Sequence, residues 1–483
     1  MAQLPLPGRS GADPVLIDGA AFAIPDLPPA PRAALGALMA AGHEAVLVGG
    51  SLRDLLRGER PEDWDIATSA RPEEVSALFP GSSWENRFGT VTLPGQDHVE
   101  ITTYRSESGY ADRRRPDEVV FHRSLRDDLA RRDVTVNAIG WLPDAPGATT
   151  GRLVDPHGGL DDLRAGRIRA VGNPADRFAE DALRVLRTVR FALRFGFAVD
   201  PATEAALREA APTTTALSAE RIRDELRRLL ADPGIRPTLA FGRWEDLGIL
   251  AVLLPELAAL RGVPQGKPIP GDALDHSLRT ADALPAQDPI LRLTGLLHDL
   301  GKATTLADGH FIGHEVVGAR MAEDAMRRLR FPAPEVARVR DLVRHHMFAY
   351  EPAWTDAAVR RFIKRVGAER LEDLFALRVA DDVASGAEEP PVGGLDELRR
   401  RVEEQRHAPM SSWHLAIDGH DLQREIGMAP GPPMGRLLDR LVEAVLDEPA
   451  RNRREVLLEL ARSWLASGDG AHHREGRDPG PEG

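Results

Sequence analysis

The chain has 483 residues, no cysteine, and a formal net charge of −13 from 62 Lys and Arg against 75 Asp and Glu. Its length predicts several domains, and the lack of cysteine excludes disulfides and thiol chemistry. The acidic balance argues against a globally basic nucleic-acid coat, so any nucleic acid would have to bind at local arginine clusters. No stretch approaches about 18 uninterrupted apolar residues, and the N-terminus lacks the features of a signal peptide. We therefore expect a soluble cytoplasmic protein without a membrane span.

The first segment that carries chemistry is a strand, turn and helix near residue 50. Apolar Ala45–Val48 reads as a buried strand, Gly49 and Gly50 make a tight turn, and residues 51–56 have helical periodicity ended by Gly58. A helix that begins after glycines offers unpaired N–H groups to phosphate, and Arg53 lies in its first turns. Alone, this pattern is more simply a turn.

A pair of carboxylates follows this helix. Asp63, Trp64, Asp65 and Ile66 alternate polar and apolar, so in an extended segment both carboxylates project from one face. Such a pair binds hard cations, and two metals about 3.5–4 Å apart can activate a hydroxyl and neutralise a triphosphate. By itself, the pair is more simply explained as the polar edge of a strand. Because it follows the glycine turn in the sequence, phosphoryl transfer is favoured.

The order of these two segments resembles the head of the nucleotidyltransferase superfamily. Residues 49–58, reading GGSLRDLLRG, and residues 62–68, reading EDWDIAT, are similar to the class II tRNA nucleotidyltransferase and bacterial poly(A) polymerase family. The resemblance implies magnesium held by Asp63 and Asp65, and phosphate contacts from the glycines. It runs in unbroken order over roughly residues 40–260.

The next strand and loop fit this resemblance. Residues 98–105 alternate again, with Glu100 on the polar side, where it is a candidate third catalytic carboxylate beside Asp63 and Asp65. Residues 105–118 hold too many charges and turn formers for a packed element and are expected to form a mobile loop, usually a sign of solvation alone. In the family, an equivalent loop helps to switch the nucleotide being added. Its arginines, 113–115, form one local basic cluster.

An arginine motif follows at residues 131–138, reading RRDVTVNA, which is similar to the family's RRDFTINA. Arg132 is a candidate contact to the triphosphate or sugar, because a guanidinium is permanently charged and can hold two phosphate oxygens. The alternative is a local salt bridge between Arg132 and Asp133.

A periodic helix is predicted from Glu180 to Arg194, and its first turn matches the family's EDxxR motif. Asp181 and Arg184 share a face at a spacing of three. A carboxylate that accepts from an exocyclic amine, beside a guanidinium that donates to a ring acceptor, suits cytosine and adenine but not uracil or guanine. The alternative is an ion pair between the two side chains. Arg187 and Arg190 continue the spacing as assisting nucleotide contacts.

A second set of metal-suited residues follows a breaker-rich link at residues 261–271. His276, the pair His298 and Asp299, and Asp381 come from separate helical segments. Imidazoles and carboxylates that converge from several helices bind transition metals, and such a metal can lower the pKa of bound water for attack on a phosphoester.

This set resembles the HD phosphohydrolase superfamily. The resemblance assigns His276, His298, Asp299 and Asp381 to the metal, with Asp382 as a weaker alternative to Asp381. His314 and His345 are candidates for a second metal position. The plain alternative is an HD helical fold whose histidines cap or pack helices without hydrolysis. The chain's three lysines are Lys267, Lys302 and Lys364, and Lys302 follows the His-Asp-Leu-Gly run directly.

By pattern, the fold class is α+β and multidomain. A nucleotidyltransferase head with a small mixed β-sheet is followed by an all-α neck, an HD-type helical domain and a helical C-terminal region. The C-terminal segment, residues 415–452, is similar to that of HD-bearing tRNA nucleotidyltransferases, and residues 395–406 read as a charged, solvated strut. The expected parts are an N-terminal extension (1–27), head (28–150), neck with base and RNA binding (151–262), HD domain (263–385), tRNA-binding region (386–467) and disordered tail (468–483).

These patterns lead to one hypothesis with three alternatives. The chain is expected to add CMP and AMP to the 3′ end of tRNA from CTP and ATP by a two-metal mechanism, with magnesium in the head and a divalent transition metal in the HD domain. Within the same class, the alternatives are a poly(A) polymerase and an enzyme that adds only CC or only A. From another class, the alternative is an HD phosphohydrolase with an inactive, RNA-binding head.

Overall fold

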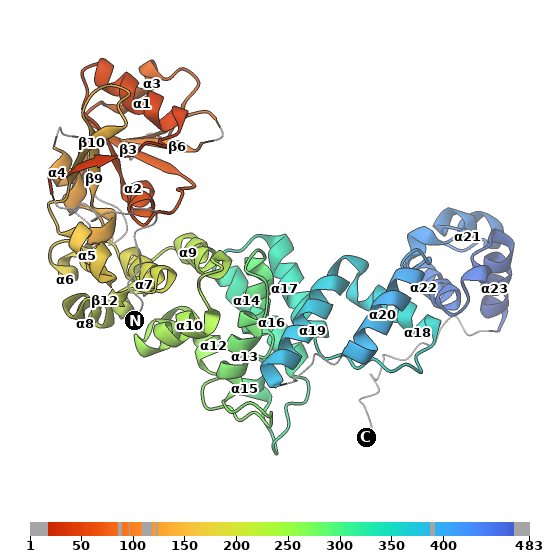
Figure 1. Cartoon of the computed structure of the whole chain (residues 1–483). Coiled ribbons are helices and arrows are strands. Elements are labelled where there is room, and N and C mark those ends of the chain that lie inside the picture. The colour runs from red at the N-terminus through yellow and green to blue at the C-terminus, as the bar shows by residue number, and fades with distance from the viewer. Residues whose placement is uncertain are drawn as a thin grey trace. The chain divides into compact units, whose positions relative to one another are not determined.

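The computed structural model describes residues 18–85, 89–95, 97–108, 118–121, 124–386 and 392–467 (Figure 1). It divides into two compact units. The first holds the described residues up to Ala259 together with Arg327–Phe331, and the second holds Leu260–Met326 and the described residues from Pro332 onward. Most of the predicted loop 105–118, with its arginines 113–115, the expected tail and most of the N-terminal extension lie outside the described residues.

The first unit begins with a mixed eight-stranded sheet in the order β1-β10-β9-β2-β3-β6-β5-β4. Its strands are β1 Ala21–Ala23, β2 Ala45–Val48, β3 Trp64–Thr68, β4 Ser83–Glu85, β5 Thr90–Thr92, β6 Val99–Thr103, β9 Gly140–Pro143 and β10 Thr150–Val154. Two short pairs lie apart from it: β7 Arg105–Ser108 with β8 Glu118–Phe121, and β11 Arg167–Ile168 with β12 Ala198–Val199. The predicted mixed sheet is confirmed.

Strand β2 occupies the middle of this sheet because all four of its residues are apolar and buried. It pairs antiparallel with β3, and β3 pairs parallel with β6 in a register that sets Asp65 opposite Glu100. The chain leaves β2 directly into α2, Gly49–Leu56, so this helix begins two residues before the predicted Ser51. Gly49 has a φ of +69°, which a side chain at this position would strain.

The remaining helices of the first unit surround the sheet and form the neck. They are α1 Pro29–Ala40, α3 Pro72–Leu78, α4 Leu125–Ala130, η1 Thr135–Asn137, α5 Gly159–Ala165, α6 Pro174–Glu180, α7 Leu183–Phe195, α8 Pro201–Ala210, η2 Ala211–Ala216, α9 Ala219–Ala231, α10 Pro237–Asp246, α11 Ile249–Leu253 and α12 Pro255–Ala258.

Helix α7 differs from its prediction at the N-terminal end. It begins at Leu183 rather than Glu180, because Asp181 adopts an extended conformation between α6 and α7 and its Oδ1 accepts from the backbone N–H of Leu183 at 3.0 Å. An aspartate side chain that accepts from a first-turn N–H favours a helix boundary over a helix interior. Asp181 and Arg184 therefore do not share a helix face.

Aromatic and arginine side chains join α2 to α7. The guanidinium carbon of Arg53 lies 4.6 Å from the ring centre of Phe195, and that of Arg57 lies 4.3 Å from the same ring. Phe195 in turn stacks on Phe191, with ring centres 5.9 Å apart. A cation over an aromatic face stabilises both groups, so α2 and α7 hold a fixed spacing.

The second unit is helical, as predicted. Its helices are α13 Ala273–Asp282, α14 Pro289–Leu297, α15 Lys302–Thr305, α16 His314–Arg328, α17 Ala333–His345, α18 Asp356–Val366, η3 Ala368–Arg370, α19 Leu371–Ser385, α20 Val392–Gln405, η4 Ser412–His414, α21 Gly419–Ile426, α22 Pro432–Asp447, η5 Pro449–Arg451 and α23 Arg454–Ala466. Among the helices of the described residues, none has the length and apolar character needed to cross a membrane.

Helix α20 covers the predicted strut and is not simply solvated. Leu395, Leu398 and Val402 are buried, and they pack into one core cluster with Phe362 and Phe375. Their spacing of three and four puts them on one face of the helix, so the charged residues between them face outward. The helix therefore seals the core of this part of the unit.

We expect Glu225→Gln to destabilise the first unit by about 3 kcal/mol, because it removes the charged partner of a buried arginine. Glu225 of α9 is 1% exposed and binds the guanidinium of Arg190, which is 8% exposed. Urea unfolding followed by circular dichroism measures the change. Asp224→Asn, at the exposed neighbouring position, is the control. An equal effect of both variants would show that the pair does not stabilise the fold.

Candidate functional site

One cavity of about 980 Å³ lies in the first unit and collects the residues that the sequence assigned to the nucleotide. Its walls come from the β2–α2 turn, the start of β3, the segment after α4, and helices α7 and α9. The predicted residues that line it are Gly49, Gly50, Arg53, Asp63, Asp65, Arg132, Asp181, Arg184, Arg187 and Arg190. Segments more than 100 residues apart in the sequence therefore meet around one volume.

The glycine turn packs directly on the carboxylate pair. A Cβ atom at Gly49 would lie 2.9 Å from Asp65 Oδ2 and 3.0 Å from a guanidinium nitrogen of Arg132. The backbone N–H of Asp65 donates to Ser51 Oγ at 3.2 Å, which ties β3 to the first turn of α2. Asp63 lines the same cavity. The two acids and the bend thus form one site.

The electrostatics of this site suit a cation. Burial raises the pKa of Asp65, the charge of Arg132 opposes this increase, and Asp63 adds to it. Burial and the charges of Asp65 and Asp63 also raise the pKa of Glu100. A shared divalent cation stabilises the charged forms of carboxylates that raise one another's pKa, and oxygen ligands favour a hard cation. The donor set fits magnesium.

Glu100 stands apart from the other predicted residues. It lies opposite Asp65 in the parallel register of β3 and β6, but its side chain is exposed and does not line the cavity. The structure therefore places Glu100 within electrostatic reach of the carboxylate pair and outside the cavity wall.

The arginines of the cavity are held by acidic and amide partners. Arg53 donates to Asn137 Oδ1 at 2.6 Å and to Asp54 Oδ1 at 2.8 Å. Arg132 donates to Asp128 Oδ2 at 3.2 Å, and Asp128 is fully buried. The predicted alternative, a salt bridge between Arg132 and Asp133, is absent.

Asp133 instead accepts from Arg187, at 2.8 Å. The charge of Arg187 overcomes the effect of burial and lowers the pKa of Asp133. This ion pair connects the arginine motif after α4 to the middle of α7, so Arg187 fixes the wall of the cavity while it lines it.

The two predicted base readers do not form the ion pair considered as the alternative. Arg184 pairs with Glu180 and donates to the backbone oxygen of Arg131 at 3.0 Å. Asp181 is held by Arg221 of α9, whose Nη1 donates to Oδ1 at 2.9 Å and whose Nη2 donates to Oδ2 at 2.6 Å. Each reader is therefore fixed by a different partner, and both face the cavity.

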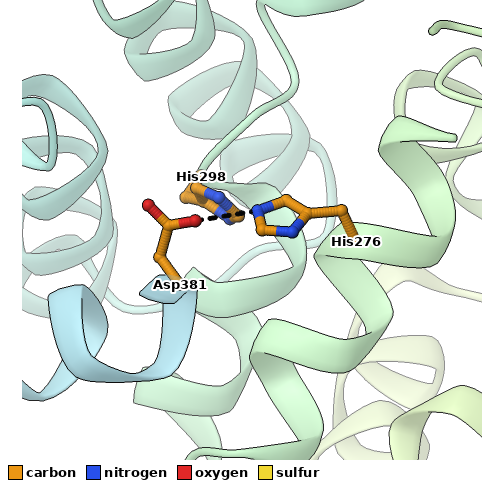
Figure 2. A group of neighbouring side chains, drawn as sticks. All are labelled: His276, His298 and Asp381. Carbon is orange, nitrogen blue, oxygen red and sulfur yellow. Dashed lines mark ion pairs between the residues drawn. The ribbon is translucent and has the colours of Figure 1, made fainter. Parts of the chain in front are cut away.

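The second predicted site also assembles, within the second unit. His276 on α13, His298 at the end of α14 and Asp381 on α19 point toward one another (Figure 2), and Nε2 of His276 lies 2.9 Å from Asp381 Oδ1. Asp299 lies 3.2 Å from His298 Nε2 and 3.5 Å from His314 Nε2, measured from its carboxylate oxygens. Four helical segments thus deliver imidazoles and carboxylates to one buried point.

The histidine that joins this cluster from α17 is His346, not the predicted His345. Nε2 of His346 lies 3.6 Å from Asp299 Oδ1 and 3.3 Å from His314 Nε2, and the side chain is 4% exposed. His345 is partly exposed and takes no part in either potential metal group. Neighbouring residues on a helix point about 100° apart, so only one of the two can face the cluster.

The donor set of this cluster fits a transition metal. Among the described residues, two groups bring ligand atoms within 4.8 Å of one another: His276, His298 and Asp381, and His298, Asp299 and His346. His298 Nε2 is buried and has no hydrogen-bond partner, although Asp299 is close. Burial lowers the pKa of His276 to about 4, so its imidazole is neutral at pH 7, as a metal ligand requires.

Comparison with known proteins identifies the family. Residues 45–169 match the poly A polymerase head domain, residues 196–260 a probable RNA and SrmB-binding site of polymerase A, and residues 273–386 an HD domain. A CCA-adding enzyme of Limosilactobacillus reuteri is 33% identical over 448 residues, 90% of this chain and 97% of the relative. The chain belongs to the CCA-adding enzymes of the poly(A) polymerase family.

Two further relatives refine this assignment. An A-adding tRNA nucleotidyltransferase of Deinococcus radiodurans is 34% identical over 430 residues, 83% of this chain and 91% of the relative. The crystal structure of the Bacillus stearothermophilus CCA-adding enzyme in complex with CTP superposes with a TM-score of 0.66 at 30% identity, covering 91% of this chain and all of that one. The chain is therefore a nucleotidyltransferase, and its head and HD domains imply the use of divalent metal.

Among the lining residues that the sequence analysis did not assign to the site, three hold predicted ones: Arg221, Asn137 and Asp133. Asn137 and Asp133 stand inside the motif at 131–138, and their positions were visible there, whereas Arg221 lies in α9. The roles of the three residues were not visible, because each acts by holding a side chain from another segment.

We expect Gly49→Ala to reduce nucleotide addition about 100-fold or more, because the methyl group displaces Asp65 or Arg132 from the cavity and strains the turn. Single-turnover incorporation of labelled CMP measures the loss. Gly42→Ala is the matched control: its φ is +86° but nothing lies within 4 Å of the added Cβ. If both variants lose activity equally, backbone strain and not the contact with Asp65 explains the effect.

Proposed function

We propose that this chain adds CMP and then AMP to the 3′ end of tRNA from CTP and ATP, completes the CCA sequence, and releases pyrophosphate. One observation carries the proposal: the glycine turn, the carboxylate pair and the two base readers face a single cavity. The CCA-adding relative, matched over nearly its whole length, and the CTP complex of the similar structure support it.

In this proposal, Asp63 and Asp65 hold magnesium, and Glu100 adds negative charge on the strand beside Asp65. Bound magnesium neutralises the triphosphate and lowers the pKa of the attacking RNA hydroxyl. The N–H groups at Gly49 and Gly50 and the guanidinium groups of Arg53 and Arg132 bind the phosphates and the sugar. Because these arginines are already fixed by Asn137 and Asp128, they lose little further freedom when the nucleotide binds.

Base selection rests on the lone pairs of Asp181. A carboxylate has about four acceptor sites, and three of them are used by Leu183 N–H and the two nitrogens of Arg221. The remaining site can accept from the exocyclic amine of cytosine or adenine, while Arg184 donates to the ring acceptor. Uracil and guanine present a carbonyl at the amine position, which leaves Asp181 facing another acceptor. Arg187 and Arg190 assist by holding the wall behind the base.

We further propose that the HD cluster binds a divalent transition metal through His276, His298, Asp299 and Asp381, with His314 and His346 as ligands of a second position. A bound metal of this kind supplies a water of lowered pKa that can attack a phosphoester. The substrates that fit are 2′,3′-cyclic phosphates or phosphomonoesters at damaged RNA ends. The observation that supports metal binding best is the buried Nε2 of His298, which makes no hydrogen bond although Asp299 Oδ2 lies 3.2 Å away.

The helices after the HD domain are proposed to have a separate role from the head and the neck. Residues 386–467, which include α21 to α23, are proposed to hold the tRNA, while residues 28–150 catalyse transfer and 151–262 read the base. The HD domain is proposed to extend over residues 263–385.

Addition of the terminal A alone is the second candidate function, favoured by the A-adding relative at 34% identity. Transcripts of one tRNA that end before CCA, after C and after CC, each offered a single labelled nucleotide, separate the two. Full CCA addition predicts CMP on the first two transcripts and AMP on the third. AMP on the third alone identifies an A-adding enzyme, CMP without AMP identifies a CC-adding enzyme, and repeated AMP on unrelated RNA identifies a poly(A) polymerase.

Two variants separate the transferase from the hydrolase. We expect Asp63→Ala to abolish nucleotide addition, because one magnesium ligand is lost, and to leave unchanged the hydrolysis of a tRNA 2′,3′-cyclic phosphate to the monophosphate. His298→Ala is expected to do the reverse. Loss of all activity on RNA ends in His298→Ala alone would identify an HD phosphohydrolase with an inactive head.

We expect Arg221→Met to lower CMP addition and to raise the ratio of UMP to CMP incorporated about tenfold, the equivalent of one charge-assisted hydrogen bond. The variant frees Asp181 to move from its fixed position. Competition between labelled UTP and CTP on a transcript that lacks CCA measures the ratio. Arg164→Met, at a surface arginine paired with Asp161 in the same unit, is the control. An unchanged ratio with a lower rate would assign Arg221 to stability alone.

A further inference from the structure

The HD cluster already contains a cation of its own, the ammonium group of Lys267. This residue lies in the link before α13, and its Nζ is 2.9 Å from His276 Nε2 and 2.8 Å from Asp381 Oδ1. Those two atoms are themselves only 2.9 Å apart. The ammonium thus bridges His276 and Asp381, two of the three residues of one potential metal group. Figure 2 draws the three residues of that group.

Lys267 and a metal cannot use these atoms together. A lysine ammonium only donates, so in the tautomer that pairs with Lys267, His276 Nε2 accepts with the single lone pair that lies in the imidazole plane, and Asp381 Oδ1 accepts from Lys267 rather than from His276. A metal ligand needs the same lone pair. Asp381 Oδ1 is likewise occupied, and its other close partners are Ser385 Oγ and His276. Metal binding at this pair therefore requires that the Lys267 ammonium leave.

Charge balance points the same way. Lys302 Nζ lies 2.6 Å from Asp299 Oδ2, so each of the two carboxylates in the cluster is matched by one ammonium. A divalent cation would add two charges to this buried group, where uncompensated charge is costly. Departure of Lys267 removes one positive charge from this group and so offsets one of the two charges that the cation adds. Its side chain is 25% exposed and sits on a flexible stem, so the ammonium can reach water.

We propose that Lys267 is an internal cation that holds His276 and Asp381 in the metal-free form and is displaced as the metal binds, so that it sets the metal affinity of the HD cluster. This inference rests on the metal role proposed above for that cluster. It assigns Lys267 to control of metal uptake rather than to a ligand or to the reaction.

The test uses the full chain, stripped with a chelator and titrated with Co²⁺ in excess Mg²⁺, which fills oxygen-donor sites. Calorimetry gives the affinity, and cobalt absorption bands report imidazole ligands. We expect Lys267→Met to bind Co²⁺ about 10- to 100-fold more tightly than the natural sequence, the equivalent of removing a charge-assisted hydrogen bond from two ligands. Lys364→Met, which removes a surface lysine paired with Glu443, is expected to change nothing.

A second measurement uses the natural sequence, in case the variant folds poorly. Lysines are labelled with an amine-reactive reagent and quantified by mass spectrometry, and Co²⁺ is expected to raise labelling of Lys267 and not of Lys364. Unchanged or weaker Co²⁺ affinity in Lys267→Met, or unchanged labelling, overturns the proposal. Failure of both proteins to bind Co²⁺ overturns it together with the HD metal role. Nucleotide addition, measured separately, would still stand.

Discussion

The nucleotide cavity depends on the pairing of its guanidinium groups with fixed carboxylates or amides. Arg132 is held by Asp128, Arg184 by Glu180, Arg187 by Asp133, Arg190 by Glu225, and Arg53 by Asp54 and Asn137. Isolated buried charge is expensive, so these pairs make an arginine-rich wall possible inside a chain of net charge −13. The wall attracts phosphate locally and stays rigid, while Asp63 and Asp65 remain turned toward the cavity.

This pairing also links the three segments that must act together. Asp128 precedes the arginine motif at residues 131–138, and Asp133 lies within it. Their carboxylates hold Arg132, which comes from that motif, and Arg187, which comes from α7. Arg53 and Arg57 of α2 stack on Phe195 at the other end of α7. Helix α7 therefore sets the distance between the glycine turn and the two proposed base readers, and in the proposed function this distance matches a nucleoside triphosphate.

Local patterns predicted the parts of this site, and tertiary contacts decided how the parts are held. The glycine turn, the alternation at Asp63 and Asp65 and the His-Asp pair follow from chain-local rules of strand and helix periodicity. The partner of Arg132 did not, because Asp128 and Asp133 are both close in sequence and only the packing of α4 chooses between them. The hydrogen bonds from Arg221 to Asp181 join residues 40 positions apart, so no local sequence pattern predicts them.

His345 takes no part in the cluster, and periodicity alone does not choose between it and His346. On α17, Val336, Val339, Leu342 and Val343 are buried, and a spacing of three leads from Leu342 to His345 as well as from Val343 to His346. The start of α7 failed for a different reason: the apolar period extends through Asp181, but its side chain accepts from the helix's first N–H and ends the period there. Side-chain capping thus overrides periodicity at helix ends.

The rarity of lysine gains a physical reason from the geometry of the HD cluster. An ammonium is a compact point charge whose single nitrogen can contact both atoms, which lie 2.9 Å apart, whereas an arginine would spread its donors over a planar guanidinium. Lys302 likewise places a compact ammonium against a single oxygen of Asp299. In the nucleotide cavity arginine is favoured instead, because phosphate and carboxylate groups present paired oxygens that match the two parallel N–H donors of a guanidinium. The choice between the two cations therefore follows the shape of the partner at each site.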